Sequence, residues 1–127
     1  MCTEVISPML DAYTLYVDET GAVHDDDTGF LRIDQDKYEK LKSLFLDIGG
    51  NTYELIPNAQ IWPRTLNELI GGKNDNIYLV IQDIGQQGYG LDFIAGLAFL
   101  ERFYSVYDTQ NQRVGFAPTQ YTSAEIN

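Results

Sequence analysis

Apolar and polar residues alternate most clearly between residues 44 and 55. Leu44, Leu46 and Ile48 lie at every second position, Gly49-Gly50-Asn51 supplies a turn, and the alternation then resumes as far as Leu55. Side chains at every second position of a strand point to the same face of a sheet. The pattern therefore predicts a β-hairpin whose strands are joined by the glycine turn.

A helical pattern comes earlier in the chain. Ser7-Pro8 is typical of a helix start, with a serine N-cap and a proline at the first helical position. Apolar side chains then follow at helical spacing until Gly21, at Met9, Tyr13, Tyr16 and Val17. We predict one amphipathic helix that ends at Gly21.

Between this helix and the hairpin, turn-forming residues separate short apolar stretches. Asp18 to Gly29 is acidic and rich in turn formers, so we expect a loop there, followed by a strand from Phe30 to Ile33. The spacing Asp36-x-x-Glu39 fits a capping box, which predicts a brief helix from Asp36 to Leu41.

The second half of the chain continues with short elements. After Pro57 the segment from Ile61 to Gly72 is expected to be irregular or weakly helical, Ile77 to Gln82 a strand, and Gly85 to Gly90 a flexible loop. A short helix and a terminal hairpin complete the pattern. The predicted fold class is mostly β, an antiparallel sheet lobe with two or three short helices.

The terminal hairpin is expected to bury one face against the helix before it. Tyr104 and Val106 alternate along the first strand, which predicts that they point into the core. The helix side of the same core is predicted to hold Phe99, Leu100 and Phe103.

Composition fits one globular domain with a strongly acidic surface. The 127 residues are 44% hydrophobic and 13% aromatic, enough for a core. With 8 Lys+Arg against 19 Asp+Glu the net charge is -11, which repels nucleic acid and anionic membranes, so neither is expected as a partner. The acidity serves solubility; the alternative is adaptation to acid, where protonated carboxylates bring the charge towards zero.

Few residues suggest a cofactor, a metal site or a targeting signal. The single cysteine, Cys2, cannot form an internal disulfide, and His24 has no second histidine or cysteine near it in sequence. The spacing Asp25-x-Asp27 fails the calcium-loop template. Met1 to Pro8 lacks the basic and apolar regions of a signal peptide, and no apolar run reaches membrane-spanning length. We expect no cofactor and no metal, and the localisation stays unknown.

Asp27-Thr28-Gly29 matches the active-site triplet of aspartic proteases, in which two carboxylates share a proton and activate a water. Such a triplet follows a buried strand, whereas Asp27 follows Val23-His24-Asp25-Asp26. Three adjacent carboxylates would repel one another if buried, so we predict a solvated loop. Asp27 is retained only as a low-ranking catalytic candidate, and no catalytic residue is assigned.

Two further segments resemble the pepsin-like aspartic proteases. The first is the run from Phe93-Ile94-Ala95-Gly96 to Tyr104-Ser105-Val106-Tyr107-Asp108, closed by Arg113-Val114-Gly115-Phe116-Ala117. The second, from Thr20 to Gly50 and on to Asn58-Ala59-Gln60-Ile61-Trp62-Pro63-Arg64, resembles the polyporopepsin-like fungal branch of that family.

The resemblance implies that residues 1–127 are a partial C-terminal lobe of a pepsin-like aspartic protease. It places the catalytic triplet at or just before Met1, and Met1 to Val5 does not contain it. The family hydrolyses peptide bonds and is secreted. We therefore expect a truncated aspartic-endopeptidase lobe that is inactive alone, binds peptide or protein, and has an N-terminal protease lobe or a second copy as partner.

Two alternatives remain open. The first is an active homodimer like the retroviral proteases, in which two copies of Asp27 meet at a two-fold axis. The second is a noncatalytic module for protein interaction.

Overall fold

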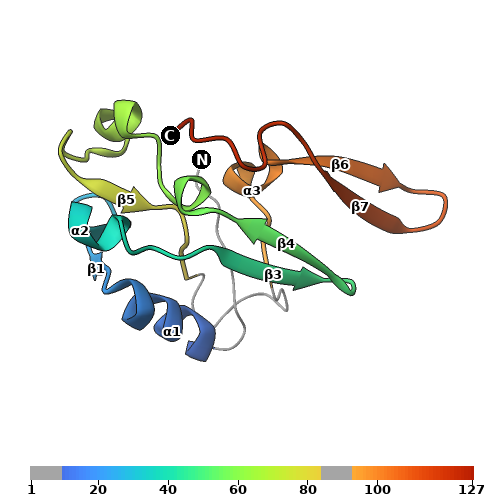
Figure 1. Ribbon diagram of the computed structural model, residues 1–127, viewed down its shortest axis with the longest axis horizontal. Helices are drawn as coiled ribbons and strands as arrows, with labels where there is room; N and C mark the ends of the chain where they lie inside the picture. Colours follow the sequence, from blue (N-terminus) through green and yellow to red (C-terminus); the bar gives the residue numbers. More distant parts are fainter. Residues whose placement is uncertain (1–9, 84–92) are drawn as a thin grey trace.

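Three small antiparallel sheets and a few short helices form the computed structural model, which describes residues 10–83 and 93–127 (Figure 1). The predicted helix start at Ser7-Pro8, the loop from Gly85 to Gly90 and Cys2 lie outside the described residues. In chain order the elements are α1 (Leu10–Thr20), β1 (Val23–His24), β2 (Leu31–Ile33), α2 (Gln35–Tyr38), β3 (Leu44–Ile48), β4 (Asn51–Leu55), η1 (Pro57–Gln60), η2 (Arg64–Ile70), β5 (Ile77–Leu79), α3 (Leu97–Leu100), β6 (Phe103–Asp108) and β7 (Arg113–Pro118); η marks a 3-10 helix.

The first sheet has the order β1-β2-β5 and carries one of two core clusters. Its central strand β2 pairs with β5, with Leu31 opposite Leu79 and Ile33 opposite Ile77. Helix α1 packs on this first cluster through Tyr13, Tyr16 and Val17; the buried members are Ala22, Leu31, Ile33, Ile61, Ile77 and Leu79. Helix α1 ends at Thr20, and Gly21 follows with a φ of 62°, as predicted from the sequence.

The β3–β4 hairpin confirms the alternation between residues 44 and 55. Leu44 pairs with Leu55 and Ile48 pairs with Asn51. Gly49 and Gly50 both have positive φ, 59° and 82°, which is the backbone that a two-residue turn of the primed type requires.

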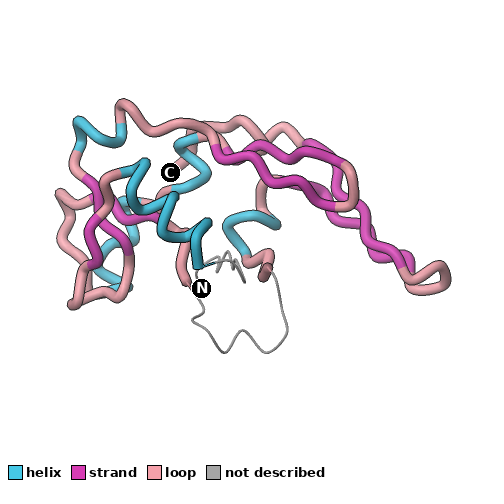
Figure 2. Tube along the Cα trace, turned by 90° about the horizontal axis from the view of Figure 1, so that it is seen from below, coloured by secondary structure: helices cyan, strands magenta, loops and turns pink. Residues whose placement is uncertain are grey.

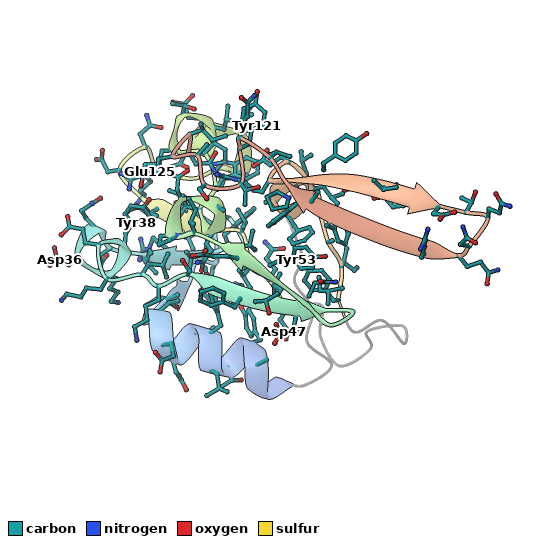
Figure 3. All side chains as sticks on the ribbon, turned by 45° about the vertical axis from the view of Figure 1, so that its right-hand side comes forward. Asp36, Tyr38, Asp47, Tyr53, Tyr121 and Glu125 are labelled. Atoms are coloured by element: carbon teal, nitrogen blue, oxygen red, sulfur yellow. The ribbon has the colours of Figure 1, made fainter. Side chains whose placement is uncertain are left out.

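The second cluster joins the β3–β4 hairpin to the C-terminal elements. Its buried members are Leu55, Ala59, Phe99 and Phe103. Tyr53 lies over it from β4 (Figure 3), with its ring centroid 5.5 Å from that of Phe103 and 6.2 Å from that of Phe99. Phe99 and Phe103 are therefore core residues, as the sequence predicted.

The β6–β7 hairpin extends away from the rest of the molecule (Figures 1 and 2). Tyr104 and Val106 are exposed on it, so the prediction that they point into the core is wrong. Phe103, one position before Tyr104, is the residue that β6 buries. A strand with apolar residues on both faces does not reveal by alternation which face is covered.

Three predicted boundaries also differ from the structure. Helix α2 spans Gln35–Tyr38 with Asp34 as its N-cap and no side-chain cap bond, so the predicted capping box is wrong. The predicted Asp18–Gly29 loop contains the end of α1 and the two-residue strand β1. Strand β5 ends at Leu79, earlier than the predicted Gln82.

The only tryptophan of the sequence, Trp62, lies on the side of the first sheet. Its ring centroid is 5.8 Å from that of Phe30, which in turn lies 6.4 Å from that of Tyr78 in β5. All three aromatic rings therefore lie with the first sheet and not with the second cluster.

None of the helices in the described part of the chain is long and apolar enough to cross a membrane.

Candidate functional site

The Asp-Thr-Gly triplet lies in the turn between β1 and β2. Asp25 Oδ1 accepts hydrogen bonds from the backbone nitrogen of Thr28 at 3.0 Å and from its hydroxyl at 3.1 Å. The Gly29 nitrogen donates to the Asp25 carbonyl at 2.7 Å, and Gly29 has a φ of 74°. Thr28 and Gly29 are thus used to close the turn.

The carboxylate of Asp27 is exposed on this turn, which confirms the expected solvated loop. Within the described residues it has no ion pair or side-chain hydrogen bond to hold it. It is Asp25 that the turn fixes: partial burial alone would raise its pKa, but the two bonds from Thr28, together with Arg32, outweigh burial and hold the pKa of Asp25 below its ordinary value. Whether Asp27 has a catalytic role stays a prediction.

Replacing Gly29 tests the turn. We expect Gly29→Ala to lower the free energy of unfolding by about 1 kcal/mol, because an alanine at this φ is strained. No atom lies within 4 Å of the position a Cβ would take, so the loss would come from backbone strain and not from a clash. Gly115→Ala is the control, since Gly115 in β7 has no positive φ and only Val106 approaches its Cβ position, at 4.0 Å. Urea unfolding of both variants measures the difference, and equal stabilities would contradict the assigned role.

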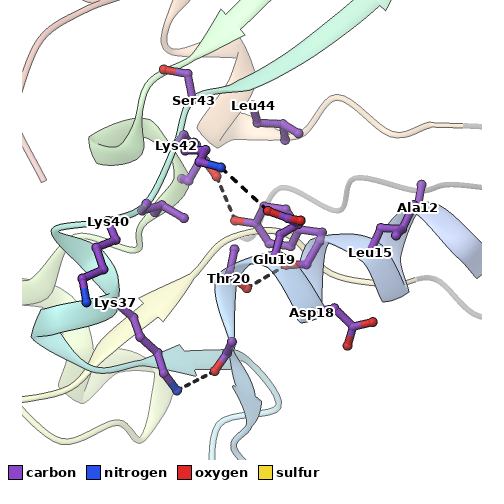
Figure 4. Close-up of a pocket in the computed structure, with 14 residues that line it drawn as sticks. Ala12, Leu15, Asp18, Glu19, Thr20, Lys37, Lys40, Lys42, Ser43 and Leu44 are labelled. Atoms are coloured by element: carbon purple, nitrogen blue, oxygen red, sulfur yellow. Dashed lines mark hydrogen bonds and ion pairs between the residues drawn. The ribbon is translucent and has the colours of Figure 1, made fainter.

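A groove of about 610 Å³ runs between α1 and the segment that joins α2 to β3 (Figure 4). We call it the α1 groove. Apolar lining comes from Ala12 and Leu15 of α1 and from Leu41 and Leu44 on the opposite side. Leu15 is 62% exposed, so an apolar side chain of α1 faces the opening.

The two sides of the α1 groove carry opposite charges. Asp18 and Glu19 lie on the α1 side, and the other side carries three lysines, at positions 37, 40 and 42. The Lys42 ammonium lies 4.0 Å from the Glu19 carboxylate across the groove, and both side chains are largely exposed. Such an exposed pair is weak and easily rearranged.

A buried arginine fixes the segment 119–127, which we call the 119–127 strap. Arg102 is 0% exposed. Its guanidinium donates to the carbonyls of Tyr121 and Ala124 and, at 3.2 Å, to Asn58 Oδ1. Desolvation lowers the pKa of Arg102, although Glu101 opposes this, and its Nε has no partner among the described residues.

Asn58 completes this attachment from η1. Its Oδ1 also accepts from the backbone nitrogens of Ile126 at 2.9 Å and Asn127 at 3.1 Å. The hydroxyls of Thr119 and Thr122 donate to the carbonyl of Arg102. The strap is therefore held by polar contacts at both of its ends.

Asp108 ends β6 and organises the turn that follows. Its carboxylate accepts from the side chain of Asn111 and, at 2.8 Å, from Arg113 Nε. These bonds hold the pKa of Asp108 below its ordinary value. Asp108 is thus a structural residue of the hairpin.

Among residues 10–83 and 93–127, no group of three or more His, Cys, Asp or Glu side chains is placed to hold a metal ion. His24 Nδ1 lies 3.2 Å from Asp26 Oδ1 on the exposed turn.

A match to a protein family defines the class of this protein. Residues 3–119 match the model of the eukaryotic aspartyl protease family. The chain belongs to this family, and the resemblance to pepsin-like proteases is confirmed.

Individual relatives support this family assignment. Polyporopepsin of Irpex lacteus is 56% identical over 118 residues, which are 92% of this chain and 35% of that protein. Gastricsin of Oryctolagus cuniculus is 35% identical over 114 residues, 90% of this chain and 26% of that protein. The crystal structure of the aspartic proteinase from Irpex lacteus superposes with a TM-score of 0.90 at 53% identity, covering 99% of this chain and 36% of that one. The chain thus spans about a third of the length of its fungal relative.

The sequence did not predict the α1 groove or the Arg102 network. The groove's lysines stand at positions 37, 40 and 42 of a strongly acidic chain, which is a signal that could have been used. Arg102 lies in sequence between Phe99 and Phe103, which were predicted to be core residues, and a charged residue is unusual in a core.

Proposed function

We propose that these 127 residues form part of the C-terminal lobe of an aspartic endopeptidase and that they cleave no peptide bond by themselves. The observation that carries the second half of this proposal is the exposure of Asp27 on a turn whose Thr28 and Gly29 are used for structure. An aspartic protease needs two carboxylates close enough to share one proton.

The carboxylates of the described residues do not resemble such a pair. In a pair that shares a proton, one pKa is raised by the neighbouring negative charge. The two aspartates whose pKa is shifted, Asp25 and Asp108, are both shifted downwards by hydrogen bonds. They therefore stay ionised to a lower pH than a free aspartate does, which suits structural acceptors and not a general acid.

The partner in this proposal is the other part of the protease. The β6–β7 hairpin supports it, because a two-stranded sheet that stands away from a core is marginal in water. Its exposed apolar residues are Tyr104, Val106, Tyr107 and Val114. Exposed apolar surface of this kind is typical of an interface, and peptide substrate would then bind between this part and its complement.

The purified chain tests the proposal directly. We expect no acid-dependent cleavage of a denatured protein at any pH from about 2 to 7, the range over which carboxylate dyads titrate. Cleavage products are followed by mass spectrometry, and a transition-state peptide inhibitor identifies any activity that arises from a carboxylate dyad.

Asp27→Asn separates the proposal from the homodimer alternative. Cleavage that the inhibitor blocks and that Asp27→Asn removes would establish the homodimer and overturn the proposal. Asp26→Asn is the matched control, because Asp26 is exposed on the same turn. Absence of cleavage in all three proteins is the result that we expect.

A further inference from the structure

The α1 groove combines three features that together describe a ligand. It has an apolar part formed by Leu15 and Leu44, it is open to solvent at Leu15, and its side opposite α1 is basic. Its volume of about 610 Å³ falls within the range of small-molecule binding sites, so the groove can hold more than a single side chain.

The basic side stands out against the charge of the chain. Only 8 Lys+Arg occur in the sequence, against 19 Asp+Glu, and three of these cations line this one groove. The ammonium group of Lys37 already donates a hydrogen bond to the Gly21 carbonyl at 2.7 Å, so it is engaged within the protein. Within the part of the chain that the structure describes, Lys40 has neither an ion pair nor a hydrogen bond from its ammonium group, so it is available to an anion.

Lys42 can also turn to an incoming anion. Its contact with Glu19 is 4.0 Å long, with 87% of the lysine side chain and 75% of the glutamate side chain exposed. Replacing this contact by one between Lys42 and a ligand carboxylate costs little free energy. Asp18 and Glu19 on the α1 side would repel the same carboxylate, so the groove favours one orientation of a ligand in which apolar and acidic parts are separate.

We propose that the α1 groove is a docking site for a peptide segment in which bulky apolar side chains are followed by carboxylates. The apolar side chains lie against Leu15 and Leu44, and the carboxylates face Lys40 and Lys42. We choose a peptide because the family acts on polypeptides; in that choice the inference rests on the proposed function. The site itself needs no catalytic residue, so its binding is measured without proteolysis.

Fluorescence anisotropy tests the proposal on the full chain. The probe is a labelled peptide in which leucines precede glutamates, and its counterpart carries glutamines in place of glutamates. We expect the acidic peptide to bind about tenfold or more tightly than the counterpart, and its binding to weaken several-fold when NaCl is raised to about 0.5 M. Equal binding of the two peptides would overturn the proposal.

Matched variants locate the site. Lys40→Glu should weaken binding of the acidic peptide about tenfold, while Lys73→Glu, the same charge change on an exposed lysine outside the groove, should not. Leu15→Ser should also weaken it about tenfold, whereas Leu69→Ser, at a leucine that is 76% exposed on η2, should leave it unchanged. Circular dichroism checks that each variant is folded.

The outcomes are separable from those of the proposed function. A loss of binding in the Lys73→Glu or Leu69→Ser control equal to that in the groove variants would mean nonspecific attraction and would overturn the site. Binding of dodecanoate at the groove, with no binding of the peptide, would overturn the peptide assignment. Neither result depends on whether the chain cleaves peptide bonds.

Discussion

Mixing this chain with the remaining two-thirds of a pepsin-like protease should produce acid proteolysis that neither part shows alone. The natural complement is the portion of the Irpex lacteus enzyme that the chain does not match, since the match covers 35% of that protein at 56% identity. We expect the cleavage rate to rise by about three orders of magnitude or more over either part, because the chain would complete the lobe that holds one carboxylate of the pair in position, and correct positioning of a catalytic group contributes on that scale.

The expected gain depends on a real interface between the two parts. The hairpin β6–β7 offers its exposed apolar side chains for this contact. Val106→Asp, at a residue that is 50% exposed, should therefore abolish the gain, because a charge would be buried at the interface. Val23→Asp is the matched control, at a valine that is 55% exposed in β1.

Refolding the two parts together and measuring peptide cleavage at acid pH gives the readout. Complementation that survives Val106→Asp but fails with Val23→Asp would place the interface on the first sheet instead. If the correctly folded parts associate, as seen by gel filtration, and still show no cleavage, the assignment of this chain to an endopeptidase lobe is wrong.

Arg102→Met should lower the free energy of unfolding by about 3 kcal/mol, the largest stability effect that we expect in the chain. The change keeps the length of the side chain but removes the donors to Tyr121, Ala124 and Asn58. Each of these is a bond from a charged donor. Asn58 Oδ1 and the Tyr121 carbonyl keep backbone donors, but among the described residues the Ala124 carbonyl loses its partner.

The same variant should release the 119–127 strap. Urea unfolding measures the stability, and limited proteolysis followed by mass spectrometry reports new cleavage within the strap. Arg113→Met is the control: the Arg113 side chain is 73% exposed and pairs with Asp108 on the hairpin turn, so its loss should cost at most about 1 kcal/mol. Similar losses in the two variants would contradict the role assigned to Arg102.

Local chemistry explains which parts of the fold the sequence predicted. The β3–β4 hairpin follows from alternation on both sides of Gly49-Gly50, and those glycines take the positive φ that the turn requires. The exposure of Asp27 also follows from its neighbours, since adjacent carboxylates resist burial. Both predictions use only residues close in sequence.

Contacts between distant residues explain what could not be predicted. Arg102 is buried because Asn58 and the strap supply its acceptors, and Asn58 lies 44 positions away. The α1 groove needs Leu15 and Lys40 to be brought together by packing. The wrong orientation of Tyr104 has the same origin, because only the position of the second cluster decides which side of β6 is covered.

The lone tryptophan beside Phe30 makes half of this molecule visible to fluorescence. Trp62 packs beside Phe30 at the first sheet, so its fluorescence emission should change when that half of the molecule unfolds. It does not report directly on Tyr53, Phe99 and Phe103 in the other half. Tyrosine and phenylalanine bands in near-ultraviolet dichroism come from both halves, because Tyr13 and Tyr16 pack on the first cluster and Tyr53 packs on the second. Denaturation curves from the two optical signals that coincide would mean that both clusters melt as one cooperative unit, and curves that separate would reveal two.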